Sequence, residues 1–276
     1  MNATNTRTVL VTGAASGIGY ETARSFAKRG YQLVISDINE AALNEVQQEF
    51  SAAGARCFAK TCDVASIDSD AELCAAAIAE SGDIDILVNN AGVAYLGGFE
   101  ETPLSEWRRI FDVNVMGIVH CINAFLPRMR AAGGRKKIVN VASLAGFSPA
   151  PNMSAYAASK HAVVGLSEVL ALELYGSEIS VLVVCPGIIE TNITQGTGMT
   201  APSITGAQLA KLQRYYHEHG AQPSVVAEGI IRSVERNDAF LFVGPMAKSG
   251  HTMGRISRRL ARRMTISGAR KSGYLN

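Results

Sequence analysis

The sequence is poor in features that would mark several classes of protein. It has five cysteines in 276 residues, and none of them forms a CxxC pair. Scattered cysteines in an odd number exclude a disulfide scaffold and give no metal-ligand spacing. No apolar run reaches the ~18 residues of a membrane span, and the start of the chain, MNATNTRTVL, lacks the apolar stretch of a secretory signal. We therefore expect a cytoplasmic protein that binds no metal.

Acidic residues are missing from one segment. Residues 246–276 contain eight lysines and arginines and no Asp or Glu, so this segment carries +8 and the other residues of a chain of net charge +2 sum to −6. An acidic body argues against nucleic-acid binding. Within the segment, Ile256, Leu260 and Met264 recur at helical intervals between arginines. This pattern favours weak contact with an anionic membrane; the alternatives are a solvated extension packed against a neighbouring subunit, or disorder.

What the sequence has in abundance is short, apolar, β-branched runs that alternate with longer helical segments. Runs that are apolar throughout predict strands covered on both faces, and their alternation with helices predicts βαβ units and a parallel sheet. The expected strands are 8–12, 32–36, 55–60, 85–89, 137–143, 179–185 and 240–244, and the expected helices are 17–29, 39–53, 66–81, 103–132, 154–176 and 207–235, the last broken near Pro223. We predict one doubly wound α/β domain over 1–245 and a basic extension over 246–276.

A glycine-rich loop follows the first expected strand and opens the first expected helix. The loop reads TGAASGIG, with Gly13, Gly17 and Gly19 in a GxxxGxG spacing, and Ser16 and Ile18 lie between them. Glycines let the backbone approach a ligand, and the free N–H groups of the helix start can bind a pyrophosphate. In the first βα turn, this loop predicts a dinucleotide site; the alternative is a plain tight turn.

Polar residues also follow the next three strands. Asp37 ends the second strand, where an acid can accept hydrogen bonds from a ribose 2′-OH and repels the 2′-phosphate of NADP. The alternative role for Asp37 is to cap the following helix. Since open α/β sheets bind ligands at the carboxyl ends of their strands, the segments after the third and fourth strands are also candidate cofactor contacts; they are Asp63, Val64, Asn90, Ala91 and Gly92.

Tyr156 and Lys160 are four residues apart in SAYAASK, with small residues between them. On a helix this spacing places both side chains on one face, one turn apart. A phenol titrates near pH ~10, and a nearby ammonium favours the phenolate. The pair could therefore be an acid/base device, or a chance pair on a solvated helix face.

Taken together, these motifs resemble those of the short-chain dehydrogenase/reductase family. TGAASGIG, NNAG, NVAS, YAASK and PGIIET occur in that family's order and spacing over about residues 7–245. The resemblance implies a single Rossmann domain with a seven-stranded parallel sheet and a homodimer or homotetramer. It implies that Tyr156 is the proton donor or acceptor, that Lys160 lowers its pKa and holds the nicotinamide ribose, and that Ser143 binds the substrate oxygen. Asn114 would complete the catalytic set through a water, and the segment against the nicotinamide would include Pro186, Gly187, Ile189 and Thr191.

The expected rim of the substrate pocket is apolar. It contains no Lys or Arg before Lys211, and its apolar members are Tyr95, Leu144, Phe147, Met153, Ile188 and Met199. We therefore expect a secondary alcohol or ketone on an apolar skeleton as substrate, with Tyr95 beside it, and NAD as the cofactor. The alternatives are an NADP-dependent carbonyl reductase and a non-catalytic dinucleotide-binding protein.

Overall fold

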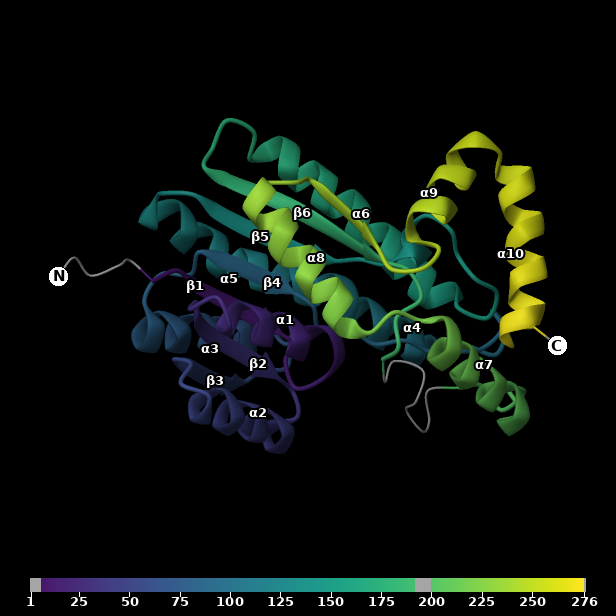
Figure 1. Ribbon diagram of the computed structural model, residues 1–276, viewed down its shortest axis with the longest axis horizontal. Coiled ribbons are helices and arrows are strands. Elements are labelled where there is room, and N and C mark those ends of the chain that lie inside the picture. Colours follow the sequence, from purple (N-terminus) through teal and green to yellow (C-terminus); the bar gives the residue numbers. More distant parts are fainter. Residues whose placement is uncertain (1–5, 192–199, 276) are drawn as a thin grey trace.

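The computed structural model describes residues 6–191 and 200–275, and within them seven strands form one parallel sheet (Figure 1). The strand order is β3-β2-β1-β4-β5-β6-β7. The predicted fold class is therefore confirmed. The chain runs outward in both directions from the neighbouring strands β1 and β4, and this reversal is the place where doubly wound sheets open a ligand crevice. The strands are β1 (Thr8–Thr12), β2 (Gln32–Asp37), β3 (Cys57–Thr61), β4 (Ile86–Asn89), β5 (Lys136–Val141), β6 (Ile179–Pro186) and β7 (Phe240–Val243).

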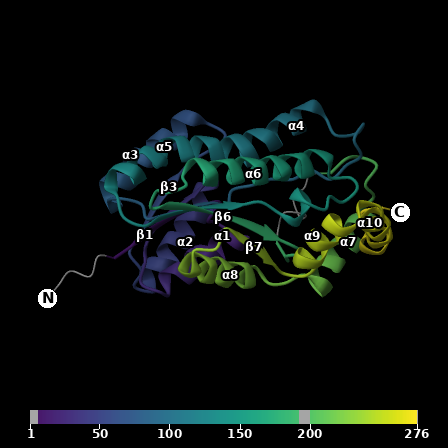
Figure 2. The ribbon, with the colours of Figure 1, turned by 90° about the horizontal axis from the view of Figure 1, so that it is seen from above.

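Helices cover both faces of the sheet (Figure 2). One face carries α3 (Ile67–Ser81), α5 (Gly117–Ala132) and α6 (Ser154–Glu173), and the other carries α1 (Gly17–Ala27), α2 (Glu40–Ala52) and α8 (Pro223–Arg236). Every residue of β1, β4 and β5 is buried. Burial on both faces explains why these strands read as unbroken apolar runs instead of alternating patterns.

The segment expected to be one helix over 103–132 contains a π-helical turn. The helix α4 (Leu104–Phe111) passes into η1 (Asp112–Met116) and then into α5. By length and composition alone, the continuous stretch Leu104–Ala132 would be long enough to cross a membrane, a test that core helices also pass. Here α5 packs on the sheet, where Ile118, Cys121 and Phe125 belong to its apolar core.

The C-terminal third folds around one end of the sheet. The predicted break near Pro223 is present, because Pro223 begins α8 after α7 (Gly206–His219) has ended. The basic segment forms α9 (Ala247–Ile256) and α10 (Arg258–Ser272), which meet at Ser257. Figure 1 shows α10 lying beside α7 at the end of the molecule that carries the carboxyl edge of the sheet. The short 3₁₀ turn η2 (Leu144–Gly146) follows β5.

Candidate active site

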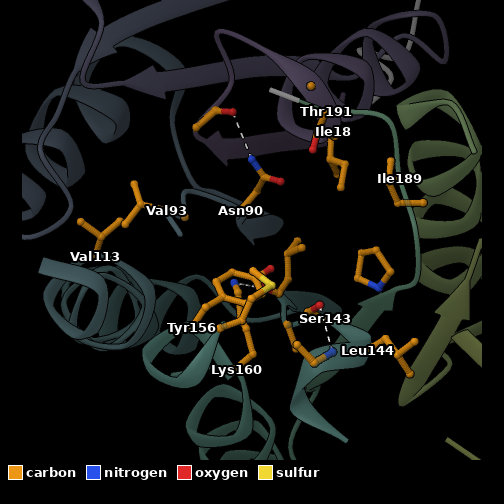
Figure 3. A pocket seen from close by; sticks show the side chains of 18 of the residues that line it. Ile18, Asn90, Val93, Val113, Ser143, Leu144, Tyr156, Lys160, Ile189 and Thr191 are labelled. Carbon is orange, nitrogen blue, oxygen red and sulfur yellow. Dashed lines mark hydrogen bonds between the residues drawn. The ribbon is translucent and has the colours of Figure 1, made fainter. Parts of the chain in front are cut away.

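A cavity of about 1070 Å³ lies where β1 and β4 end. This volume is at the upper end of the ~300–1,000 Å³ usual for ligand pockets, so the cavity can hold a dinucleotide and a substrate together. Figure 3 shows Ile18, Asn90 and Thr191 on one side of it, and Ser143, Tyr156 and Lys160 on the other. Two groups of residues that are far apart in the sequence therefore face each other across one space.

The glycine loop packs closely on the end of β4. Gly13 has φ +63°, and a Cβ added there would lie 2.8 Å from the Cα of Ala91. A Cβ on Gly19 would overlap the carbonyl oxygen of Gly13. Gly13, Ser16, Gly17 and Ile18 line the cavity, whereas Gly19 lies behind the loop and is not among the described lining residues. Gly19 therefore lets the helix approach the strand; it does not touch the cavity.

Asn90 holds the glycine loop against the end of the sheet by hydrogen bonds. Its amide Nδ2 donates to the carbonyl oxygens of Thr12 and Gly13, each at 3.0 Å. The hydroxyl of Thr12 in turn accepts hydrogen bonds from the backbone N–H groups of Asn90 and Ala91, at 3.1 and 3.2 Å. Asn90, Ala91 and Gly92 all line the cavity. These bonds occupy the NH₂ group of Asn90 and fix its side chain against the loop.

The start of α1 is suited to an anion. Ser16 precedes the helix, its side chain caps none of the first N–H groups, and the first turn holds no acidic residue. Unpaired N–H groups at a helix start attract phosphate. The N–H groups and the glycine loop therefore fit the pyrophosphate of a dinucleotide.

Asp37 faces the same cavity from the end of β2. Its Oδ2 accepts a hydrogen bond from Ala15 N at 3.0 Å, and its Oδ1 accepts one from Asn39 N at 3.0 Å. The cap of α2 is Asn39, whose side chain accepts from Ala42 N. Asp37 is therefore not the helix cap, and its carboxylate keeps lone pairs for a ligand hydroxyl.

Asp63 and Val64 line the cavity after β3. The Oδ1 of Asp63 accepts from Ala65 N at 3.0 Å, which fixes the turn. Val64 is buried against α5, because a Cβ on Gly117 would lie 2.8 Å from its side chain. Both residues stand where a base could pack beyond the end of the strand.

Tyr156 and Lys160 project from the first turns of α6 into the cavity. The ammonium Nζ of Lys160 lies 5.7 Å from the centre of the Tyr156 ring and donates to the carbonyl oxygen of Val141 at 2.9 Å. Burial lowers the pKa of Lys160 to about 8, so the side chain is charged at neutral pH. The helix spacing in the sequence therefore does place both groups on one face.

The pKa of Tyr156 goes against the sequence-based expectation. Burial raises it to about 12, the hydrogen bond to Ser143 lowers it, and Tyr216 raises it further. Lys160 does not overcome this burial. The chain by itself therefore keeps Tyr156 protonated at neutral pH, as a proton donor.

Ser143 reaches Tyr156 because η2 packs tightly on α6. A Cβ on Gly146 would lie 2.8 Å from the carbonyl oxygen of Lys160. The hydroxyl of Ser143 accepts a hydrogen bond from Ala145 N at 3.1 Å, which holds its oxygen at the cavity wall. Ser143 can then donate its own hydrogen to a substrate oxygen.

Asn114 lies behind the cavity, in the π-helical turn. It is fully buried, accepts from Val93 N at 2.8 Å, and donates to the oxygens of Val93 and Ser159 at 2.9 and 3.0 Å. A Cβ on Gly92 would lie 3.3 Å from its Oδ1 and 3.5 Å from Lys160 Nζ. π-helical turns are frequent at functional sites, and this one turns Asn114 toward the end of β4.

The segment after β6 forms another wall. Pro186, Gly187, Ile188, Ile189 and Thr191 line the cavity. The segment is held by backbone hydrogen bonds to the neighbourhood of β7 and α8, from Gly187 N to Val243 O and from Glu190 N to Ala221 O. These residues can contact the nicotinamide end of a cofactor.

Two of the expected rim residues are placed elsewhere. Tyr95 is 7% exposed, packs with Ile110 and Ala155, and is not among the described lining residues. Gly97, which forms a strand-like contact with Met153, lies against the Tyr95 ring, and the expected contact of Tyr95 with a substrate stays a prediction. Phe147 packs against Phe242 and His251 instead of the cavity. Leu144, Met153 and Ile188 do line it, and Met199 lies outside the described residues.

Sequence reasoning missed much of the wall opposite Asp37. The described lining includes residues of α4, α7 and α10, one residue before α9 and one after α10 that belong to no motif; they are Ser105, Arg108, Arg109, Tyr215, Tyr216, Met246, Met264, Thr265, Gly268, Ala269, Ser272 and Tyr274. Arg109 pairs with Glu106 at 2.7 Å, whereas Arg108 is exposed at the edge. The basic segment thus forms part of the pocket wall, and only the folded chain reveals this.

Among the described residues, no group of three or more His, Cys, Asp or Glu side chains could hold a metal ion. A Rossmann sheet with a glycine loop, an acid at the end of β2 and a Ser–Tyr–Lys set in one cavity defines a dinucleotide-dependent oxidoreductase.

Comparison with known proteins supports this class. Residues 7–201 match the short chain dehydrogenase family, and the chain belongs to that family. It is 34% identical over 252 residues to the probable oxidoreductase EphD of Mycobacterium bovis, covering 90% of this chain and 43% of that protein. The chain thus spans less than half the length of that relative.

Solved structures are also similar. A short chain dehydrogenase/reductase from Burkholderia phymatum in complex with NAD is 31% identical, with a TM-score of 0.80, covering 87% of this chain and 90% of that one. Actinorhodin polyketide ketoreductase with NADPH is 31% identical, with a TM-score of 0.77, covering 87% and 97%. Similar proteins thus bind either nucleotide.

Proposed function

We propose that the chain transfers a hydride between NAD(H) and a secondary alcohol or ketone on an apolar skeleton, with Tyr156 as the acid/base. The observation that carries this proposal is the opening of Ser143, Tyr156 and Lys160 into the same cavity as the glycine loop and Asp37. When bound, the cofactor supplies the hydride and, in its oxidised form, a positive charge; positioning and proton transfer belong to the protein.

In the direction of ketone reduction, Tyr156 gives a proton to the substrate oxygen. With its pKa raised to about 12 by burial, the phenol holds that proton at neutral pH. Ser143 donates to the same oxygen and fixes its position, which supplies orientation. Alcohol oxidation runs the steps backward and needs the phenolate, whose population rises tenfold per pH unit below the pKa. Oxidation therefore depends more strongly on pH than reduction does.

Lys160 and Asn114 support the proton transfer. One N–H of the Lys160 ammonium is bound to Val141 O, so two donors remain for a ribose hydroxyl. Asn114 holds the backbone of Val93 and lies near Lys160 across Gly92. We assign Asn114 the ordering of a water that passes the proton onward from this end of the cavity.

Asp37 supports NAD over NADP. Its carboxylate lines the cavity and keeps lone pairs free, and Ser16 and Ile38 beside it carry no positive charge that would balance a 2′-phosphate. An NADP-dependent carbonyl reductase is the alternative. Initial rates with the two nucleotides at equal concentration distinguish them.

A panel of secondary alcohols incubated with NAD⁺ tests the function itself. Formation of NADH by the unmodified chain, and its loss in the Tyr156→Phe variant, is the expected result. The alternative of a non-catalytic dinucleotide-binding protein would be supported by tight NADH binding without turnover of any alcohol or ketone in a wide panel.

A homodimer or homotetramer is also part of the proposal. Val169 and Leu172 on the outer side of α6 are 54% and 75% exposed, and apolar side chains on a long helix favour burial against a second copy. Sedimentation equilibrium gives the mass. Val169→Glu should shift the mass toward the monomer.

Contact of the basic segment with an anionic membrane is a further part of the proposal. Ile256, Leu260, Met264 and Ile266 are exposed among the arginines of α9 and α10. This arrangement supports salt-sensitive binding to anionic vesicles. The test replaces Arg258, Arg259, Arg262 and Arg263 by Gln, which keeps the pocket wall, and compares sedimentation with the vesicles at low and high salt. A cytoplasmic location is consistent with five free thiols.

A further inference from the structure

The C-terminal end of the chain is docked on α7 by three contacts. Lys211 Nζ donates to the carbonyl oxygen of Arg270 at 2.8 Å, at the end of α10. Gly273 then turns the chain with φ +95°, and a Cβ there would lie 3.1 Å from both Gln208 O and Leu212 N. Only glycine combines this conformation with this approach. The residues at the end of α10 therefore have a defined position against α7 (Figure 1).

The turn at Gly273 directs Tyr274 inward. The carbonyl oxygen of Tyr274 accepts a hydrogen bond from Asn152 Nδ2 at 2.6 Å and one from Gln208 Nε2 at 3.4 Å. Its ring is 8% exposed and shares an apolar cluster with Met153, Tyr156 and Ala269. Tyr274 thus lines the same cavity as the candidate acid/base.

The hydroxyl of Tyr274 is 2.6 Å from the hydroxyl of Tyr216, and either can be the donor. Two hydroxyls hold two hydrogens, and their mutual bond uses one. Within residues 6–191 and 200–275, no other hydrogen-bond partner of either hydroxyl is found. The pair therefore offers one unused O–H donor and free lone pairs to the cavity, and a buried donor without a partner is costly.

The surroundings favour a neutral ligand group. Burial raises the pKa of both tyrosines, so both stay uncharged. Lys211, on the same helix as Tyr216, donates to Arg270 O and is not among the described lining residues of the cavity. A carboxylate buried against the two hydroxyls would lose its hydration. A hydroxyl or carbonyl oxygen would match the free donor and lone pairs without this cost.

We propose that Tyr216 and Tyr274 bind a second, neutral oxygen of the substrate, apart from the oxygen that reacts beside Ser143 and Tyr156. This assignment rests on the proposed function for the reacting end. It makes the substrate a bifunctional compound, an apolar skeleton that carries a second carbonyl or hydroxyl group. Met153 and Ala269 line the same part of the cavity.

The test compares two ligands that differ only in the second oxygen. A bicyclic diketone and the matching monoketone are titrated calorimetrically into the full chain saturated with NAD⁺, a complex that cannot reduce either ketone. We expect the unmodified chain to bind the diketone about tenfold more tightly, as one well-placed hydrogen bond allows. Tyr274→Phe and Tyr216→Phe should reduce this preference to about twofold or less and leave the monoketone affinity unchanged. Tyr175→Phe, at a 92% exposed site, is the control and should keep the preference.

Three results would overturn the assignment: no preference in the unmodified chain, including failure to bind either ketone; a preference that survives both variants; or an equal loss of affinity for both ketones. Turnover with NADH is measured separately. If both ketones bind but neither is reduced, the proposed function fails, and the binding comparison still decides the role of the tyrosine pair.

Discussion

The two halves of the cavity are built by different means. The half that faces Asp37 consists of glycine backbone and strand ends within residues 12–92, fastened by Asn90 and Thr12. The half that carries Tyr156 is assembled from side chains of η2, α6, α7 and α10 and from Met246 before α9, within residues 143–274. The first half is set by glycines and polar residues at fixed spacings. The second half combines the motif residues Ser143, Tyr156 and Lys160 with a wall of side chains from α7 and α10 that belong to no motif. The comparison explains why that wall could not be found in the sequence.

The largest effect is expected where the two halves meet, at Tyr156. Tyr156→Phe removes the proton and keeps the ring, so turnover should fall by the ~10²–10⁴ assigned to general acid–base catalysis. Binding of NADH, followed by its fluorescence, should be preserved. Lys160→Met should lose turnover and also weaken NADH binding, because it removes a donor at the cofactor end. A Tyr156→Phe enzyme with near-normal turnover would refute the role of the phenol.

A substitution at Gly19 is expected to disturb only the half of the cavity within residues 12–92, which we assign to the nucleotide. Gly19→Ala places a methyl group on the Gly13 carbonyl oxygen. The backbone must move, at ~3 kcal/mol or more of unfolding free energy, and NADH affinity should fall with it. Gly165→Ala is the matched control, since a Cβ on this residue of α6 meets nothing within 4 Å, and helix propensity favours Ala by ~1 kcal/mol. Urea unfolding and NADH titration measure both; equal behaviour of the two variants would contradict the account.

Asp70, in α3, lies behind the half of the cavity that we assign to the nucleotide, and its carboxylate allows a test of stability there. Its carboxylate is fully buried, and Cys121 Sγ donates to Oδ1 at 2.8 Å, while Oδ2 has no hydrogen-bond partner among the described residues. Burial raises the pKa of Asp70 from 3.8 to about 6, partly offset by Cys121 and His120. The unfolded chain therefore loses this proton at lower pH than the folded one. Its ionisation lowers stability as pH rises from about 4 to 6, and the whole penalty is present above pH 6.

Asp70→Asn should remove that penalty. At pH 7.5 the variant should gain roughly 2–3 kcal/mol over the unmodified chain, from a shift of about two units at ~1.4 kcal/mol each, and at pH 3.5 it should gain little. Urea midpoints at the two pH values, compared between the proteins, isolate this group from all others. The same pH dependence in both would show that Asp70 is not the source.

Asp37→Ala is expected to have the smallest effect, and it tests the preference of this half of the cavity for NAD over NADP. Asp37→Ala removes both the acceptor for the ribose 2′-OH and the repulsion of a 2′-phosphate. The ratio of kcat/KM for NAD to that for NADP should fall about tenfold, equivalent to ~1.4 kcal/mol. If the unmodified chain already uses NADP better than NAD, the interpretation of Asp37 is wrong.

The sequence predicted the parallel sheet because its central strands are buried on both faces and read as continuous apolar runs. It also predicted the residues that share a cavity at Gly13, Asp37, Tyr156 and Lys160, since strand ends and helix spacing place them together. Periodicity could not reveal the π-helical turn at Asp112–Met116, because an apolar helix with one widened turn keeps an apolar pattern.

The wall formed by α7, α10 and Tyr274 could not be predicted from the sequence, for a different reason. Tyr216 and Tyr274 are 58 positions apart, and their contact depends on the close packing of Gly273 against α7. The arginines of α10 predict an exposed basic face, whereas its small residues, Gly268, Ala269 and Ser272, line the cavity. The packing of Tyr95 with Ile110 and Ala155 could not be predicted, because a loop position does not tell which way a ring turns.

Direct transfer of hydrogen between alcohol and cofactor tests the central claim. The unmodified chain is incubated with NAD⁺ and a cyclic secondary alcohol that carries deuterium on the carbinol carbon, and the reduced nucleotide is examined by mass spectrometry. The account predicts one deuterium in the nucleotide formed by the unmodified chain and at least ~10²-fold less of it with Tyr156→Phe. Reduced nucleotide without deuterium, or equal labelling by the Phe variant, would contradict it.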